Sequence, residues 1–426
     1  MKHAIPVAQL QNIVGPQVEE MAAAIEACVH CGFCLPTCPT YKVLNEEMDS
    51  PRGRILLMKS VLENTLTIQD VLPYIERCLG CLACVTACPS GVKYGDLVSP
   101  FRALAEETVG QSFLERTQRL IVKETLPYPG RFRSAAALGK FAQPFRKVLP
   151  GQFQSMLELL PAGLPEERPL PDLVQPEGKR RARVALLSGC VQQVISPEIN
   201  WATLRVLAKN GVEVVIPKAQ TCCGALFMHM GDKKRARGLI RQNLAAFPID
   251  VDAIITNAAG CGSGMKEYGS LFRGTEEEGR ARSFSSQVMD VSEFLAQIGM
   301  VVPPPLPVQM DAAYHDACHL AHAQGVIDAP RELLGSIPNL TLHDIAEWDI
   351  CCGSAGTYNM EQPEIAAELG RRKAANILKT GADLVVTGNV GCMVQIMAHL
   401  NAAGARPVPV YHTMQVLDKA YREQQV

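Results

Sequence analysis

Two short cysteine-rich segments carry the clearest chemistry in the sequence. Residues 28–39 read C-V-H-C-G-F-C-L-P-T-C-P, and residues 78–89 read C-L-G-C-L-A-C-V-T-A-C-P. Both match the pattern C-x2-C-x2-C-x3-C-P, in which three closely spaced cysteines can bind three irons of one cubane cluster. The fourth cysteine, followed by a helix-breaking proline, reaches a second cubane. The two segments therefore predict two neighbouring [4Fe–4S] clusters.

Exchange of the fourth cysteine between the segments sets the predicted ligands, as in two-cluster bacterial ferredoxins. The first cluster is expected to bind Cys28, Cys31, Cys34 and Cys88, and the second Cys78, Cys81, Cys84 and Cys38. The alternative is a pair of zinc knuckles, because C-x2-C is a common zinc motif. Zinc gives no reason for a third cysteine in each triplet or for the repeated Cys-Pro. The exchange holds two clusters side by side, which suits electron transfer between them.

Eight further cysteines form two similar sets in the C-terminal half. Each set has a lone cysteine, a Cys-Cys-Gly and another lone cysteine: Cys190, Cys222, Cys223 and Cys261, then Cys318, Cys351, Cys352 and Cys392. Adjacent cysteines can face one metal centre where the following glycine, Gly224 or Gly353, permits a sharp turn. Four thiolates are enough for a further iron–sulfur cluster or a zinc ion. The alternative is that these thiols are buried without metal.

Two histidines lie beside the second of these sets. The segment Tyr314-His-Asp-Ala-Cys-His319 places His315 and His319 on either side of Cys318. Most such histidines are hydrogen-bonded loop residues, so we expect that role for both. The alternative is that one of them binds a metal.

Apolar runs precede the C-terminal cysteines, and helical stretches such as 199–211 and 364–381 separate these runs. Strands that alternate with helices predict a parallel sheet, with the cysteines gathered at the carboxyl ends of the strands. The repeat of the cysteine set predicts that this unit is duplicated. The N-terminal region reads as mostly helical around its cysteine loops. We therefore predict an α/β protein with a mostly helical N-terminal domain followed by two duplicated lobes.

Cysteine positions and proline-rich stretches set the predicted domain boundaries. Proline-rich linkers are expected within residues 161–183 and at 301–308. The predicted units are a di-[4Fe–4S] ferredoxin-like domain (1–110), a helical connector and linker (111–183) and two cysteine-rich lobes (184–300 and 309–426).

Composition narrows the class of protein and its compartment. The net charge is −2, and the chain has only 2 Trp and 5% aromatic residues, so nucleic-acid binding is not expected. The N-terminus lacks the apolar segment of a secretory signal, and no run approaches the roughly 18–20 apolar residues of a membrane helix. The 16 cysteines are therefore expected as reduced, metal-binding thiolates in the cytoplasm.

The C-terminal cysteine sets resemble the CCG domains of heterodisulfide reductases. Similar domains occur in anaerobic glycerol-3-phosphate dehydrogenase and in the iron–sulfur subunits of lactate and glycolate oxidases. In the reductases the last element is C-x-x-C, whereas this chain has Gly264 and Gln395 at the fourth positions. The missing fifth thiolate argues against a non-cubane cluster and against disulfide-reducing catalysis.

The whole chain resembles the iron–sulfur subunit of bacterial glycolate oxidase. The resemblance rests on ACVHCGFC, TCPTY, PRGRI, RCLGC, ACPSGV, CCGSAGTY and GNVGC, in this order. It implies that separate FAD-binding subunits oxidise glycolate to glyoxylate, and that this chain passes their electrons to an acceptor other than oxygen. No dinucleotide-binding G-x-G-x-x-G follows a predicted strand, so we expect no flavin and no catalytic residue here. Alternatives are the same relay for a lactate or glycerol-3-phosphate dehydrogenase, and a disulfide reductase.

A basic and aromatic segment suggests contact with the inner membrane. Residues 127–160 contain five basic residues and one acid, interleaved with four phenylalanines: Arg131, Arg133, Lys140, Arg146, Lys147, Glu158, Phe132, Phe141, Phe145 and Phe153. This pattern suits peripheral binding to anionic lipid on the cytoplasmic face. The alternative is that the phenylalanines pack against the lobes or a flavin subunit.

Overall fold

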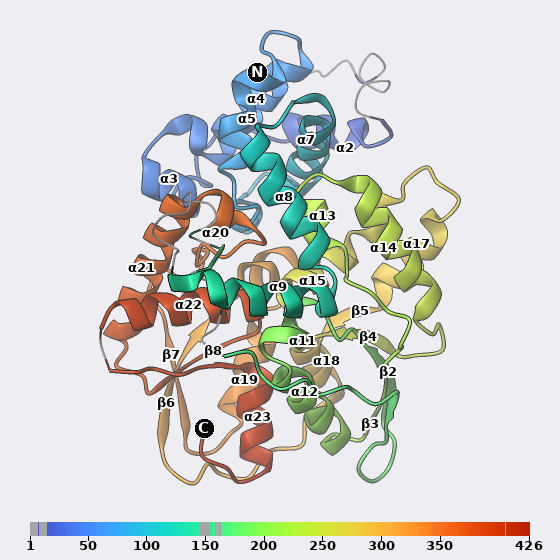
Figure 1. Cartoon of the computed structure of the whole chain (residues 1–426), viewed down its shortest axis with the longest axis vertical. Helices are drawn as coiled ribbons and strands as arrows, with labels where there is room; N and C mark the ends of the chain where they lie inside the picture. The colour runs from blue at the N-terminus through green and yellow to red at the C-terminus, as the bar shows by residue number, and fades with distance from the viewer. Residues whose placement is uncertain are drawn as a thin grey trace.

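The computed structural model describes residues 7, 15–144, 154, 156, 157, 160, 163–404 and 406–426. A helical N-terminal part lies on top of two α/β lobes (Figure 1). The predicted fold class is confirmed: the N-terminal part is helical, and the sheets of the C-terminal part are built mainly from parallel strands.

Short helices surround the two cysteine loops of the N-terminal part. They are α2 (Val18–Glu26), α3 (Pro39–Leu44), η1 (Glu47–Asp49), α4 (Pro51–Leu62), α5 (Ile68–Glu76), α6 (Ala83–Thr86) and α7 (Gly95–Thr108). Ser50 caps α4 by accepting a hydrogen bond from the Gly53 amide, and Thr67 and Asp70 form a capping box on α5. These caps fix where the helices begin, and α2, α4, α5 and α7 then bury a common apolar core.

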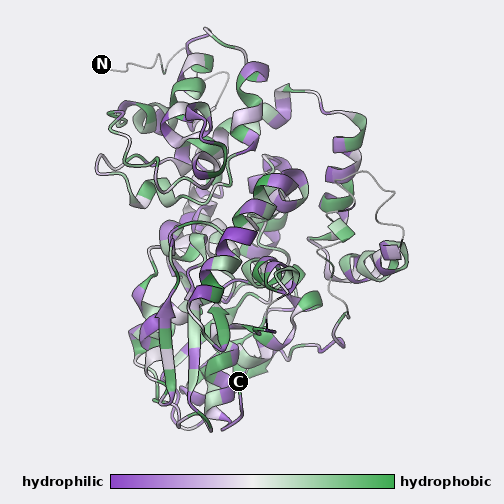
Figure 2. Cartoon of the chain, turned by 90° about the vertical axis from the view of Figure 1, so that its left-hand side faces the viewer, coloured by the Kyte–Doolittle hydropathy of each residue, from purple (hydrophilic) through white to green (hydrophobic). Residues whose placement is uncertain are grey.

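Two further helices connect this part to the lobes. They are α8 (Phe113–Thr125) and α9 (Pro129–Ala142). In Figure 2 they lie along one edge of the molecule, and each shows both hydrophilic and hydrophobic residues.

The first lobe is a five-stranded sheet in the order β1-β3-β2-β4-β5. Its strands are β1 (Leu173–Val174), β2 (Ala182–Leu186), β3 (Val212–Val215), β4 (Ala253–Thr256) and β5 (Val288–Asp290). Only β1 runs antiparallel to its neighbour. The helices are α11 (Val191–Ile195), α12 (Glu198–Lys209), α13 (Ala225–His229), α14 (Lys233–Ala246), α15 (Ala259–Lys266), α16 (Tyr268–Leu271), α17 (Glu278–Gln287) and α18 (Val291–Ile298).

The second lobe repeats this order without the extra edge strand, as β7-β6-β8-β9. Its strands are β6 (Met310–His315), β7 (Leu340–Asp344), β8 (Leu384–Thr387) and β9 (Val410–His412), all parallel. The helices are the π-helix η3 (His319–Ala323), α19 (Asp328–Gly335), α20 (Tyr358–Glu361), α21 (Pro363–Lys379), α22 (Val390–Ala402) and α23 (Thr413–Tyr421). The duplication read from the cysteines therefore extends to the strand order.

The two lobes share one apolar core. The helices α12 and α23 pack together, and Leu204 and Leu207 belong to the same buried cluster as Met414 and Leu417. The central strands β4 and β8 are buried along their whole length, since helices cover both faces of each sheet. The lobes thus form a single packed base beneath the cysteine loops.

Candidate metal centres

The two N-terminal cysteine loops, residues 28–38 and 78–88, have the same backbone shape. In the first cysteine loop the left-handed residues are His30 (φ 55°) and Gly32 (φ 85°), and in the second they are Gly80 (φ 65°) and Leu82 (φ 61°). Each pair occupies the third and fifth positions of its motif. Two left-handed residues within five positions turn the chain sharply, and this turn lets three cysteines face one centre.

Cysteines of the two loops approach each other as the predicted exchange requires. One cavity is lined by Cys28, Cys31 and Cys34 of the first loop and by Cys84 and Cys88 of the second. Burial raises the pKa of Cys84, and the charges of Cys78 and Cys38 raise it further. Burial and the charge of Cys88 raise the pKa of Cys28, so Cys88 lies beside the first loop's thiols, as Cys38 lies beside those of the second. The ligand sets remain a prediction, which this arrangement supports.

A buried arginine lies beside the second group of thiols. Arg54 is only 1% exposed, and its Nη1 lies 3.9 Å from the Cys38 sulfur. Arg54 also donates to the Tyr74 carbonyl at 2.7 Å and to Asp49 at 3.1 Å. Burial alone would raise the pKa of Cys78, but the charges of Arg54 and Arg102 lower it. A fixed cation here favours thiolates and a negatively charged cluster.

Sequence reasoning did not single out this arginine. Arg54 belongs to the segment PRGRI, which carried part of the family resemblance. Its approach to Cys38 depends on a contact between helix α4 and the first cysteine loop, which motif spacing does not encode.

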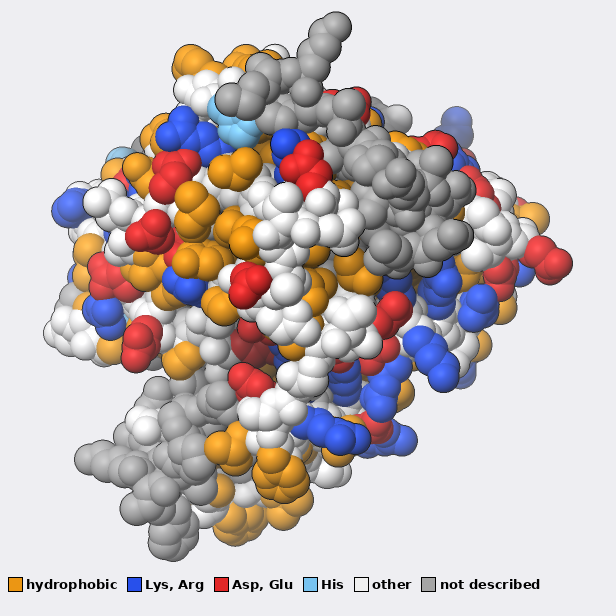
Figure 3. Space-filling view, turned by 90° about the horizontal axis from the view of Figure 1, so that it is seen from above, with side chains coloured by type: hydrophobic (Ala, Val, Ile, Leu, Met, Phe, Trp, Pro, Cys, Tyr) orange, Lys and Arg blue, Asp and Glu red, His pale blue; other side chains and the backbone are white. Residues whose placement is uncertain are grey.

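The two cysteine loops face different surroundings. In the first loop Cys31 is exposed, and the neighbouring Val29 and Phe33 are 67% and 63% exposed. Figure 3, which views the molecule from the N-terminal end of Figure 1, shows hydrophobic side chains interspersed with charged ones. In the second loop Cys78 and Cys81 are buried. The first loop is thus open to a partner, and the second is enclosed by the protein.

The second cysteine loop packs mainly against the second lobe. The ring Nε2 of His319 lies 3.1 Å from the Gly80 carbonyl oxygen, and the Thr86 hydroxyl lies 2.9 Å from Nδ1 of His322. Cys81 and Cys351 share a buried apolar cluster. Burial, followed by the charge of Cys351, raises the pKa of Cys81. Cysteines far apart in sequence are therefore close neighbours at this contact.

In both lobes the cysteines lie beyond the carboxyl ends of the strands, as predicted. Cys190 follows β2 and Cys318 follows β6, while Cys261 and Cys392 lie in the first turns of α15 and α22. A helix N-terminus favours a thiolate. The Cys-Cys pairs follow β3 and β7, and the turn at each following glycine is left-handed, with φ of 82° at Gly224 and 93° at Gly353.

Sulfur spacing in the lobes suits metal binding. The sulfurs of Cys190 and Cys222 are 3.4 Å apart, and those of Cys318 and Cys351 are 3.7 Å apart. Two thiolates on one tetrahedral zinc ion lie about 3.8 Å apart, given a Zn–S bond of about 2.3 Å. The donor sets therefore fit a metal, whose presence and identity remain predictions.

The two positions that lack a fifth cysteine are filled by other contacts. A Cβ atom on Gly264 would lie 2.6 Å from the Cβ of Ala225, so the first lobe has no room for a side chain there. In the second lobe Gln395 is buried and donates to the Ala366 carbonyl at 3.1 Å. Both contacts agree with the expectation that the lobes lack the five-thiolate arrangement.

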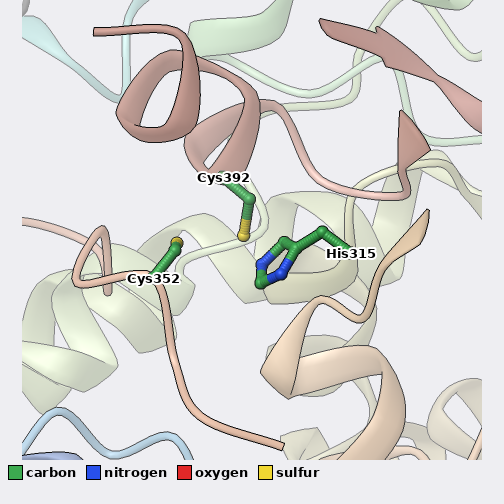
Figure 4. Close-up of side chains that lie close together, drawn as sticks. All are labelled: His315, Cys352 and Cys392. Atoms are coloured by element: carbon green, nitrogen blue, oxygen red, sulfur yellow. The ribbon is translucent and has the colours of Figure 1, made fainter. Parts of the chain in front are cut away.

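The histidines beside Cys318 have different environments. His319, the first residue of η3, contacts the Gly80 carbonyl, so the expected hydrogen-bonded role is met there. His315, the last residue of β6, is 1% exposed, and within the described chain neither ring nitrogen has a hydrogen-bond partner. One of its nitrogens and the sulfurs of Cys352 and Cys392 all lie within 4.8 Å of one another (Figure 4). The expectation of a hydrogen-bonded role is therefore not met at His315.

Comparison with known families agrees with this architecture. Residues 24–92 match the family described as "4Fe-4S dicluster domain", and residues 184–266 and 312–397 each match the "Cysteine-rich domain". The chain is 36% identical over 416 residues to the probable glycolate oxidase iron–sulfur subunit of Bacillus subtilis, covering 93% of each protein. It is 34% identical to the glycolate oxidase iron–sulfur subunit of Escherichia coli, covering 95% of this chain and 96% of that one.

The chain belongs to the glycolate oxidase iron–sulfur subunit family. As a member of this family it is an iron–sulfur subunit that transfers electrons. A crystal structure of a hypothetical protein from Helicobacter pylori shares the fold, with a TM-score of 0.51 and 11% identity over 97% of this chain and 74% of that one. Within the described ranges no helix is both long and apolar enough to cross a bilayer.

Proposed function

We propose that this subunit accepts electrons from a separate FAD-binding subunit that oxidises glycolate to glyoxylate. The electrons then pass through two [4Fe–4S] clusters, held by the two predicted ligand sets, towards a respiratory acceptor other than oxygen. The observation that carries this proposal is the opposite environment of the two cysteine loops, one exposed at Cys31 and one buried at Cys81. A relay needs one centre open to its donor and another close to the route onward.

Electrons are proposed to enter at the first cysteine loop. Val29 and Phe33 are large apolar side chains exposed beside Cys31, and such groups suit a protein partner. When bound, a cubane carries one electron at a time, so two adjacent cubanes suit a flavin that releases two. The protein's own part is to hold the thiolates close together and to place Arg54 beside Cys38 and Cys78.

The C-terminal lobes are proposed to hold at least one further metal, either an iron–sulfur cluster or zinc. The buried sulfur of Cys351 lies beside the second cysteine loop, so a redox-active metal there would extend the relay.

Peripheral membrane contact from the cytoplasmic side is a further part of the proposal. The described residues restrict the surface that can contact the membrane, because Phe132 packs into the first lobe and Arg131 pairs with Glu124 at 2.9 Å. Leu138 and Phe141 on α9 remain 71% and 80% exposed. The predicted contact residues Arg146, Lys147, Phe145 and Phe153 lie outside the described residues.

Liposome flotation tests the membrane contact. Wild-type protein should float with anionic vesicles, and Leu138→Asp with Phe141→Asp should abolish binding. The control is Ile249→Asp with Val302→Asp, because both of these apolar residues are also exposed. Flotation that survives the α9 substitutions would exclude this surface.

Reduction by the flavin subunit tests the relay. Anaerobic protein with about 8 Fe per chain should be bleached when the flavin subunit and glycolate are added together. D-lactate and glycerol-3-phosphate, with their own dehydrogenases, serve as alternative donors. Faster reduction by either alternative would reassign the partner, and stoichiometric zinc with negligible iron would end the relay proposal.

Cys38→Ala tests the ligand exchange. It should remove the EPR signal that Cys78→Ala also removes, and leave the signal that depends on Cys28. Loss of the Cys28-dependent signal instead would show that each loop keeps its own fourth cysteine.

A further inference from the structure

A buried imidazole in the second lobe lies beside two cysteine sulfurs. His315 ends the central strand β6, and its side chain points towards Cys352 and Cys392 in Figure 4. Both ring nitrogens are sealed from solvent, yet neither meets a hydrogen-bond partner among the described residues. An unpaired polar group in a dry interior is costly, so its presence indicates an unseen partner.

The distances around His315 are those of a metal site. Its ligand atom and the sulfurs of Cys352 and Cys392 lie within 4.8 Å of one another, and all three residues are buried. Around a tetrahedral zinc ion, a thiolate sulfur and an imidazole nitrogen lie about 3.6 Å apart. Small side-chain movements therefore bring the three donors onto one ion.

The first lobe provides an internal contrast. Cys190 and Cys318 follow the corresponding strands β2 and β6, and the residue three positions before each is Leu187 or His315. Leu187 is 1% exposed and belongs to an apolar cluster. The same site in one fold thus holds a hydrocarbon side chain in one lobe and a nitrogen donor in the other.

We propose that His315 is a nitrogen ligand of a tetrahedral metal ion that Cys352 and Cys392 bind in the second lobe. The thiol of Cys351 contacts that of Cys352, so Cys351 can supply the fourth ligand of the ion. This inference rests on the proposal above that the lobes hold a further metal, and it specifies the ligands of that metal. It makes the second-lobe centre a mixed nitrogen and sulfur site, whereas the first lobe offers sulfur alone at the corresponding positions. Iron and zinc both accept such ligands.

The test uses the full chain, purified without oxygen and reconstituted with Fe²⁺ or Zn²⁺. The wild type should bind metal beyond the iron of the N-terminal clusters. If the additional metal is zinc, X-ray absorption at the zinc edge should show one nitrogen neighbour among sulfurs. If it is iron, pulsed EPR of protein labelled with ¹⁵N-histidine should show a nitrogen coupling.

His315→Leu copies the side chain of the first lobe. It should lower the affinity for the additional metal at least about tenfold and remove the nitrogen signal. His343→Leu is the matched control, because His343 lies in the same lobe on β7 and instead contacts Asp311 at 2.7 Å. His315→Cys should restore metal binding with sulfur neighbours only, which separates loss of a ligand from loss of folding.

Three results would overturn the inference. They are a wild-type chain that binds no additional metal under either condition, an additional metal without a nitrogen neighbour, and unchanged affinity in folded His315→Leu. Reduction of the N-terminal clusters by the flavin subunit and glycolate is measured in the same samples. Its failure in wild type would count against the relay, while the metal measurements would still decide the role of His315.

Discussion

The two C-terminal lobes have the same strand order and the same cysteine set, but they place these cysteines in different surroundings. In the first lobe Leu187 lies in an apolar cluster, and the amides of Gln192, Asn200 and Asn257 hydrogen-bond to one another at 2.8–2.9 Å. In the second lobe the residue that corresponds to Leu187 is His315. The duplication therefore preserved the positions of the thiols, while the side chains next to them differ between the lobes.

The lobes also differ in their contact with the N-terminal clusters. Second-lobe residues reach the second cysteine loop through His319, His322 and Cys351. The first lobe takes part through His229, whose ring stacks on His319 with centroids 5.1 Å apart. A metal in the second lobe would therefore be the nearer neighbour of the second cluster. The comparison predicts that matched substitutions in the two lobes have unequal effects.

Alanine at the two turn glycines should give the largest difference. Both residues are left-handed, which costs an alanine about 1–2 kcal/mol. A Cβ on Gly353 would also lie 2.7 Å from the backbone oxygen of Ala366, whereas on Gly224 the nearest atom, the Ala236 oxygen, is 3.4 Å away. Gly353→Ala should lower the free energy of unfolding by roughly 3 kcal/mol, and Gly224→Ala by about 1 kcal/mol. Denaturation midpoints of the two variants measure these losses of stability. Equal shifts would show that the two glycine turns do not differ.

Acid should weaken the contact that both lobes make with the second loop. Burial, with the charges of His319 and Arg102, lowers the pKa of His229 to about 3 from 6.5. Below pH 6.5 His229 is protonated in the unfolded chain but stays neutral in the folded chain. Stability is therefore complete above about pH 6.5 and falls as the pH drops towards 3, by at most about 1.4 kcal/mol per pH unit.

His229→Phe keeps a flat ring but removes this titration. The drop in melting temperature between pH 7.5 and 5.5 should be smaller in His229→Phe than in wild type. His343→Phe, at a partly exposed histidine, should retain the wild-type drop. An equal drop in wild type and His229→Phe would show that other groups control the acid response.

Local spacing explains why so much of the N-terminal site was predictable. Cubane coordination imposes a repeat of three residues, which is visible in the sequence as Cys28, Cys31 and Cys34. The alternation of apolar runs and helical stretches likewise predicted that Cys190 and Cys318 follow parallel strands. Both signals reside in residues close together along the chain.

The features missed by sequence reasoning depend on contacts between distant segments. Arg54 reaches Cys38 from helix α4, and Phe132 packs into the first lobe instead of facing outward. The sequence predicts a hydrogen-bonded loop role for His315, because most histidines that lie near a cysteine in sequence have that role. The fold instead places it against Cys352 and Cys392, which lie 37 and 77 positions further along. Only the packing of three strand ends creates that group.

Serine substitutions in the two Cys-Cys pairs should produce a smaller but more specific difference. Cys351 packs with Cys81 in one buried apolar group. Burial and a thiolate at Cys351 raise the pKa of Cys81, so the charge of Cys351 is expected to act on the proposed second [4Fe–4S] cluster as well. Removing that charge should make the cluster easier to reduce and raise its midpoint potential by on the order of tens of millivolts. Cys222, the corresponding residue of the first lobe, belongs to a different buried cluster with Cys223 and Ala225, and Cys222→Ser should leave the potential unchanged. Redox titration followed by EPR compares the two variants with wild type. Similar shifts in both variants would mean that the second cluster does not distinguish the lobes, and a lowered potential in Cys351→Ser would contradict the electrostatic argument.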